Sequence, residues 1–245
     1  MRLSIRTSIG AAAFLFVAVV GVAHAVPTAS LHASNTGISA FAFEFDGATN
    51  TITLRETWTG TGPGIVQLSG LDDLGENLNY TVIKIITNSS GVTWTSFAQE
   101  LLDPAGFADE LDAPTPSFAP PGFTSSGESD GLSFAQGSAT PRTSTVFGSV
   151  SVDELAGRDF LDFFGGSLLN GNVDTLTYGL QDNNGLGDED CVETACPNQP
   201  FLLVQRPNSR SDSNGTSIPA PAPLLLVGGG LIVLALGYRR ALAAF

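Results

Sequence analysis

The sequence is poor in the side chains that carry out most catalytic chemistry. In 245 residues, histidine occurs twice, cysteine twice and methionine once. His24 directly follows an N-terminal apolar stretch. The domain that comes after this stretch therefore has one histidine, His32. A Ser-His-Asp triad and a histidine-based zinc site both need imidazole groups at the reaction centre. We therefore expect a non-enzymatic protein with no catalytic residues and no required cofactor.

Positive charge is scarce as well. Ten Lys and Arg residues stand against 24 Asp and Glu residues, the formal net charge is −14, and Lys84 is the one lysine. Phosphate backbones repel such a chain, so nucleic acid is not an expected partner. Carboxylate pairs such as Asp109-Glu110 and Asp153-Glu154 arise by chance in so acidic a sequence. No nucleophile or base motif accompanies them, which argues against a glycosidase.

The N-terminus has the three-part pattern of a secretory signal peptide. Two arginines precede the apolar stretch Ile9–Val22, and Ala23 and Ala25 place small residues on both sides of His24. The alternative is an N-terminal membrane anchor, for which the apolar stretch is short. We predict that residues 1–25 are removed by signal peptidase after Ala25.

The C-terminus has a second three-part pattern. Pro219, Ala220 and Pro221 form a break, the apolar run Leu224–Gly237 follows, and Arg239 and Arg240 come after it. The stretch from 219 to 238 contains 20 residues, which is enough for a helix to span a bilayer. The arginines would stay in the cytoplasm and the larger N-terminal part outside. Residues 224–238 are therefore a predicted transmembrane helix.

This tail resembles the PEP-CTERM sorting signal of Gram-negative bacteria. In that family a Pro-Glu-Pro motif precedes an apolar helix and an arginine cluster, and a membrane transpeptidase, exosortase, cuts near the motif. Ala220 stands where the family has an acidic residue, and Ala241–Phe245 follow the arginine pair. The resemblance covers residues 218–245. It implies transient residence in the inner membrane, an exosortase-type partner, and delivery to the cell surface or extracellular matrix.

Residues 26–207 form the predicted domain, and the polar stretch 208–217 is a predicted flexible linker. Phe41–Phe45 and Thr51–Trp58 alternate in polarity around turn residues 47–50, which predicts a β-hairpin. Tyr80–Thr87 is rich in β-branched residues and predicts a central strand. Further strands are expected at 65–68, 92–95, 132–135, 146–152, 173–180 and 201–204.

Two other segments predict irregular or helical structure. Phe97–Leu102 is a predicted brief helix that Pro104 ends, and residues 112–145 are a predicted long loop. Many short strands separated by turns indicate an all-β, antiparallel β-sandwich, and a jelly-roll connection also fits. The segment Ile86–Phe97 resembles one that recurs in exported PEP-CTERM proteins, which implies a sandwich of that group.

Cys191 and Cys196 enclose four residues. In an exported protein such a pair predicts a disulfide, which would stabilise the fold by about 2 kcal/mol. The alternative is a redox pair, although the spacing is not Cys-x-x-Cys.

An acidic turn and two tryptophans are candidate ligand sites. Asp182, Asn184, Asp188 and Asp190 offer oxygen ligands for calcium, although the EF-hand pattern fails, and the other interpretation is a solvated acidic turn. Trp58 and Trp94 could stack on sugars, but such residues more often fill a sandwich core.

Three functional hypotheses follow from these patterns. The first is an exported, non-enzymatic surface or matrix protein sorted through its C-terminal signal. The second is a binding module for extracellular polysaccharide, assisted by calcium. The third is a permanently anchored membrane protein with a single span.

Overall fold

The computed structural model describes residues 26–71, 79–104, 117–126, 132–135, 141–153, 158–182, 200–210 and 218–219. These residues form strands and turns, with no helix among them. Within the same ranges, a helix with the length and apolarity needed to cross a membrane is not found. The predicted signal peptide and the apolar run Leu224–Gly237 lie outside the described residues.

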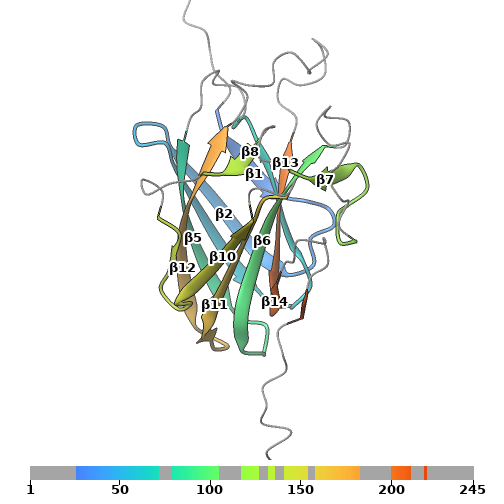
Figure 1. Ribbon diagram of the computed structural model, residues 1–245, viewed down its shortest axis with the longest axis vertical. Coiled ribbons are helices and arrows are strands. Elements are labelled where there is room, and N and C mark those ends of the chain that lie inside the picture. Colours follow the sequence, from blue (N-terminus) through green and yellow to red (C-terminus); the bar gives the residue numbers. More distant parts are fainter. Residues whose placement is uncertain are drawn as a thin grey trace, which may run out of the picture.

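Two sheets face each other and enclose the core (Figure 1). We call the first one sheet A. It has the order β1 (Thr28–Leu31), β4 (Gly64–Ser69), β13 (Phe201–Pro207), β6 (Trp94–Pro104), β11 (Phe160–Leu168) and β10 (Ser149–Asp153), and β7 (Phe123–Ser125) also pairs with β6.

The second sheet, sheet B, has the order β2 (Ile38–Asp46), β3 (Thr51–Trp58), β5 (Asn79–Asn88), β12 (Val173–Asp182) and β8 (Leu132–Phe134), with β9 (Thr143–Ser144) also on β12. The short strands β14 (Ser209–Arg210) and β15 (Ile218–Pro219) pair separately. Neighbouring strands are antiparallel except β3 and β5, which run parallel. The prediction of an all-β fold with antiparallel sheets is confirmed for the described residues.

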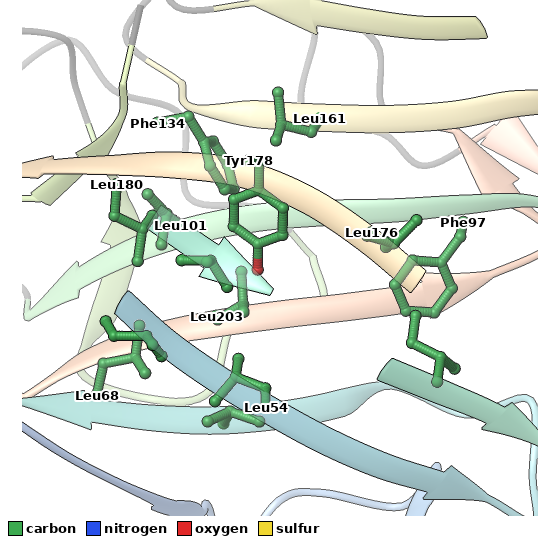
Figure 2. Packing of buried hydrophobic residues seen from close by; sticks show 14 of the residues in the cluster. Leu54, Leu68, Phe97, Leu101, Phe134, Leu161, Leu176, Tyr178, Leu180 and Leu203 are labelled. Atoms are coloured by element: carbon green, nitrogen blue, oxygen red, sulfur yellow. The ribbon is translucent and has the colours of Figure 1, made fainter. Parts of the chain in front are cut away.

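The main core lies between the sheets. In β5, Tyr80, Val82 and Ile86 are fully buried while Thr81 is exposed, as the two-residue period of a strand requires. Figure 2 shows Leu54 and Tyr178 of sheet B packed near Leu203 of sheet A. Burial of each such side chain contributes about 1.5–3 kcal/mol, so this layer supplies most of the favourable energy of the fold.

Sheet A is also covered on its outer face. Ile65, Leu102, Leu202 and Val204 form a second buried cluster, against which the segment 117–126 packs through Phe118 and Phe123. The central strands of sheet A are therefore buried on both faces, and every residue of β13 from Phe201 to Pro207 is buried.

This two-sided burial explains an error in the sequence interpretation. The predicted helix at 97–102 is wrong, because these residues belong to the continuous strand β6. A strand that is buried on both faces loses the polar-apolar alternation, so its apolar run reads like a short buried helix.

Other expected strands agree with the structure. The hairpin is confirmed as β2 and β3, whose register pairs Phe43 with Leu54 and whose turn places Asn50 at a positive φ of 49°. The strand predicted at Tyr80–Thr87 is β5, which lies between β3 and β12 in the middle of sheet B. The strand expected at 132–135 is confirmed as β8. The rest of the segment predicted as a long loop contains β7 and β9, and the strand expected from residue 146 begins at Ser149.

A glycine at the start of β4 makes room for Trp58, one of the two tryptophans of the core. A Cβ atom at Gly64 would lie 2.2 Å from Cη2 of Trp58, which is itself fully buried. Gly64→Ala should therefore lower the free energy of unfolding by about 1–3 kcal/mol, because the ring cannot move away without disturbing its neighbours. The measurement is equilibrium denaturation in urea.

Gly148→Ala is the control, since a Cβ atom there meets only Gly165 O at 3.6 Å. Equal stability of the two variants would contradict this account of the packing around Trp58.

Candidate functional site

The positive side chains of the domain are mostly inside it. Residues 26–207 contain Arg55, Lys84, Arg142, Arg158 and Arg206 as their Lys and Arg residues. Lys84 and Arg158 are 0% exposed and Arg206 is 6% exposed. Arg142 is half-buried and Arg55 is exposed. The buried cations form two clusters, one between the sheets and one on the outer face of sheet A.

The first cluster joins three strands across the core, and we call it the inter-sheet triad: Glu56 of β3, Lys84 of β5 and Gln205 of β13. Glu56 follows Ile52 and Leu54 on the inward-facing positions of β3. Lys84 takes the corresponding inward position in β5, and Gln205 in β13. Strand alternation thus directs three polar side chains into the apolar layer.

Direct hydrogen bonds hold the inter-sheet triad together. Lys84 Nζ donates to Glu56 Oε1 at 2.7 Å and also to Gln205 Oε1. Gln205 Nε2 donates to the same Glu56 Oε1 at 2.9 Å. The amine, the amide and the carboxylate therefore contact one another pairwise in the interior of the sandwich.

Aromatic side chains enclose this group. Trp58 Nε1 donates to Glu56 Oε2 at 3.0 Å, so both carboxylate oxygens are engaged. The Tyr178 hydroxyl, which points into the space between the sheets in Figure 2, donates to Gln99 Oε1 at 3.0 Å. The rings of Trp58 and Trp94 meet edge to face with centroids 5.5 Å apart. These contacts exclude solvent from the triad.

Burial shifts the ionisation of the enclosed groups. Removal from water lowers the pKa of Lys84, and the neighbouring Glu56 opposes this shift. Burial, with a smaller contribution from the charge of Glu56, raises the pKa of Tyr178 well above its usual value. Lys84 and Gln205 are 0% exposed and Glu56 is 2% exposed, so an external substrate does not reach them. The chemistry open to these three groups is chemistry with one another.

The second cluster lies on the outer face of sheet A, under the segment 117–126. Arg158 donates to Glu100 through Nε at 2.9 Å and through Nη2 at 2.8 Å to both carboxylate oxygens. Arg206 Nη2 reaches Glu100 Oε2 at 3.3 Å, and Ser125 Oγ donates to Oε1 at 3.2 Å. The Arg206 guanidinium lies 3.5 Å from the ring centroid of Phe118.

Burial raises the pKa of Glu100, and the two arginines act against that shift. This cluster fastens the covering segment to the sheet.

A small cavity lies beside β9 and β10. It has a volume of about 200 Å³ and is lined by residues that include Arg142, Ser144 and Phe163. Next to it, Asp174 accepts hydrogen bonds from Ser144 Oγ and from Thr145 N at 3.0 Å, which fixes this stretch of chain to β12. Ligand sites for small molecules usually measure about 300–1,000 Å³, so this cavity is small for such a role.

The structure places both candidate glycan-contact residues in the core. Trp58 and Trp94 are each 0% exposed, and both belong to the main apolar cluster. A buried indole offers no face to a sugar, which corrects the glycan-contact hypothesis in favour of the core interpretation.

Most other predicted site residues lie outside the described ranges. Asp182 is the last residue of β12, and the other three candidate calcium ligands, Asn184, Asp188 and Asp190, are not described. Groups of three or more His, Cys, Asp or Glu that could hold a metal are not found in the described part of the chain. Pro219 belongs to β15. The remaining sorting, cleavage and cysteine positions are outside the description: Ala23, Ala25, Cys191, Cys196, Ala220, Pro221, Arg239 and Arg240.

Sequence reasoning missed both buried clusters. Lys84 did carry a signal, because it is the one lysine and interrupts the most strongly β-branched run of the sequence. Glu56 occupies an inward position of an alternating strand and could have been noticed in the same way. Arg158 and Glu100 carried no such signal, since their environment depends on the cover of sheet A. Gln205 carried none because β13 is buried on both faces and lacks a polar-apolar alternation.

Comparisons of this chain with protein-family models, with curated proteins and with solved structures each found no match.

The outer-face cluster makes a prediction about stability. Glu100→Gln removes the carboxylate that two buried guanidinium groups bind, and it should lower the free energy of unfolding by about 3–5 kcal/mol. The measurement is urea denaturation at neutral pH.

Glu44→Gln is the matched control, because Glu44 is exposed on the edge strand β2 and the same chemical change there should cost little. A loss at Glu100 no larger than that at Glu44 would show that this ion cluster is not needed to hold the segment 117–126.

Proposed function

We propose that this chain is an exported, non-enzymatic protein of the surface or extracellular matrix of a Gram-negative bacterium. In this proposal residues 1–25 direct export, residues 26–207 form the delivered β-sandwich domain, and residues 218–245 act as the sorting signal. The helix at 224–238 holds the chain in the inner membrane until an exosortase-type enzyme processes it.

The observation that carries the proposal is the distribution of charge in the domain. Three of its five Lys and Arg side chains are buried in ion pairs, which leaves Arg55 and the half-buried Arg142 as its surface cations. The whole chain carries a formal net charge of −14. A surface so poor in cations is repelled by nucleic acid and by anionic membrane surfaces and stays well solvated. This supports a delivered domain that works in the aqueous exterior.

The burial of the polar clusters supports a structural role over a catalytic one. Both carboxylate–cation clusters lie in the interior and tie strands or covering segments together. Groups that serve an external substrate need an accessible cleft with convergent polar side chains. We therefore favour a protein that acts through its folded surface, with extracellular polysaccharide as a predicted partner for which Trp58 and Trp94 are not the contacts.

The sorting signal is tested by mass spectrometry of cell fractions from an exosortase-containing Gram-negative host. The surface fraction should contain a chain that begins at Val26 and lacks the peptide with Arg239 and Arg240. Arg239→Ala with Arg240→Ala should leave an unprocessed chain in the inner membrane, because the basic stop then no longer holds the helix in its orientation.

Arg210→Ala is the control, since it removes one positive charge from the segment before the helix and should not change sorting. An intact C-terminus on a chain kept in the inner membrane would support permanent anchoring instead. A cytosolic chain with both termini intact would contradict export altogether.

A further inference from the structure

We propose that Lys84 and Gln205 form an intramolecular isopeptide bond, with Glu56 as the proton-transfer group. The bond would join Nζ of the lysine to Cδ of the glutamine and so link β5 of sheet B covalently to β13 of sheet A. The inference concerns the inter-sheet triad alone and does not rest on the proposed function.

The arrangement of the three side chains fits this reaction. Lys84 Nζ contacts Gln205 Oε1, so the attacking nitrogen lies beside the carbonyl group that it would attack. Glu56 Oε1 lies 2.7 Å from Lys84 Nζ and 2.9 Å from Gln205 Nε2. One carboxylate oxygen is therefore within hydrogen-bond distance of both the nitrogen that must lose a proton and the nitrogen that must gain one. This is the position that a general acid–base group requires.

The surroundings favour the reactive forms of these groups. An amine attacks a carbonyl only when it is neutral, and burial lowers the pKa of Lys84 toward that form. Two buried side chains held in contact react as an intramolecular pair, at a high effective concentration. The apolar shell around Trp58 excludes water, which would otherwise compete for the amide carbon.

The reaction balances without any co-reactant. A proton passes from the Lys84 ammonium group to Glu56, and the neutral Nζ then attacks Cδ of Gln205. Glu56 gives its proton to Nε2 and accepts the one that Nζ releases, the Cδ–Nε2 bond breaks, and ammonia leaves and is protonated. The products are one secondary amide and one ammonium ion, and no group is oxidised or reduced.

The position of the bond gives it a structural consequence. Lys84 and Gln205 are separated by 121 residues in sequence and connect the two facing sheets. A covalent link that closes so long a loop restricts the unfolded chain, as a disulfide does. It would tie the two sheets together without using a cysteine.

The direct test is the mass of the purified full-length chain in its folded state. Loss of ammonia should lower the intact mass by about 17 Da. The reference is the mass calculated from the sequence that starts at the N-terminus found in the sample. Chymotrypsin cleaves at aromatic residues that flank both positions, such as Tyr80, Trp94 and Phe201. The digest should contain a branched peptide in which Lys84 is joined to Gln205.

Another source of the same mass loss must be separated from this one. An Asn-Gly sequence such as Asn170-Gly171 can lose ammonia when it cyclises to a succinimide. A succinimide is opened by mild alkali and leaves linear peptides, whereas an isopeptide bond survives and leaves a branched one. A deficit that disappears in mild alkali, or one located at an Asn-Gly sequence, overturns the proposal.

Three variants and one control complete the test. Lys84→Arg and Gln205→Glu each remove a reacting group, and Glu56→Gln removes the proton-transfer group, so all three should have their full sequence mass. Glu44→Gln makes the same chemical change as Glu56→Gln at an exposed position of β2, and it should keep the mass deficit.

The wild-type result decides the question even if a variant fails to fold. A folded wild-type chain with its full mass, and with separate linear peptides for Lys84 and Gln205, overturns the proposal. A deficit that persists in Glu56→Gln overturns the role of the carboxylate.

Discussion

The contact of Lys84 with Glu56 and Gln205 is the constraint on which the arrangement of the two sheets depends. A lysine that is buried without partners is strongly unfavourable, so the fold is stable only when β3 and β13 bring their polar groups to it. Strand periodicity therefore fixes the register of β3, β5 and β13. A shift of one residue in any of the three strands would turn the polar side chain to the opposite face and leave the others unpaired.

The second constraint is the cover on the outer face of sheet A. The segment 117–126 buries an additional apolar cluster and the ion cluster around Glu100. Its presence turns β6 and β13 into strands that are enclosed on both sides. The same cover removes Arg158 and Arg206 from the surface, which connects the packing of the fold to the scarcity of cations on its exterior.

Alternation in the sequence predicted strands that have one face toward solvent, and residues 201–204 of the enclosed strand β13 were also predicted as a strand. The hairpin of β2 and β3 and the central position of β5 followed from alternation, turn residues and β-branched content. The sequence interpretation failed at β6, where burial on both faces erased the alternation. It also missed β7 and β9, short strands that depend on longer neighbours for their pairing.

The candidate site was less accessible to sequence reasoning than the fold. The one lysine in an apolar strand was visible, but its partner Gln205 lies 121 residues away on β13 of the other sheet, and the packing of the two sheets brings it to Lys84. Long-range contacts of this kind depend on topology, which the pattern of one strand does not contain. The tryptophans are a case in which sequence reasoning worked. Such residues more often fill a sandwich core than stack on sugars, and Trp58 and Trp94 are buried in the core.

Because Lys84 is the one lysine of the chain, selective labelling of lysine Nζ with nitrogen-15 gives a single side-chain signal that reports on the inter-sheet triad. Nuclear magnetic resonance of the folded protein should show that signal as a secondary amide with one slowly exchanging proton. An ammonium or free-amine signal at this position would contradict the cross-link, and one that exchanges rapidly with water would also contradict the burial of Lys84 between the sheets.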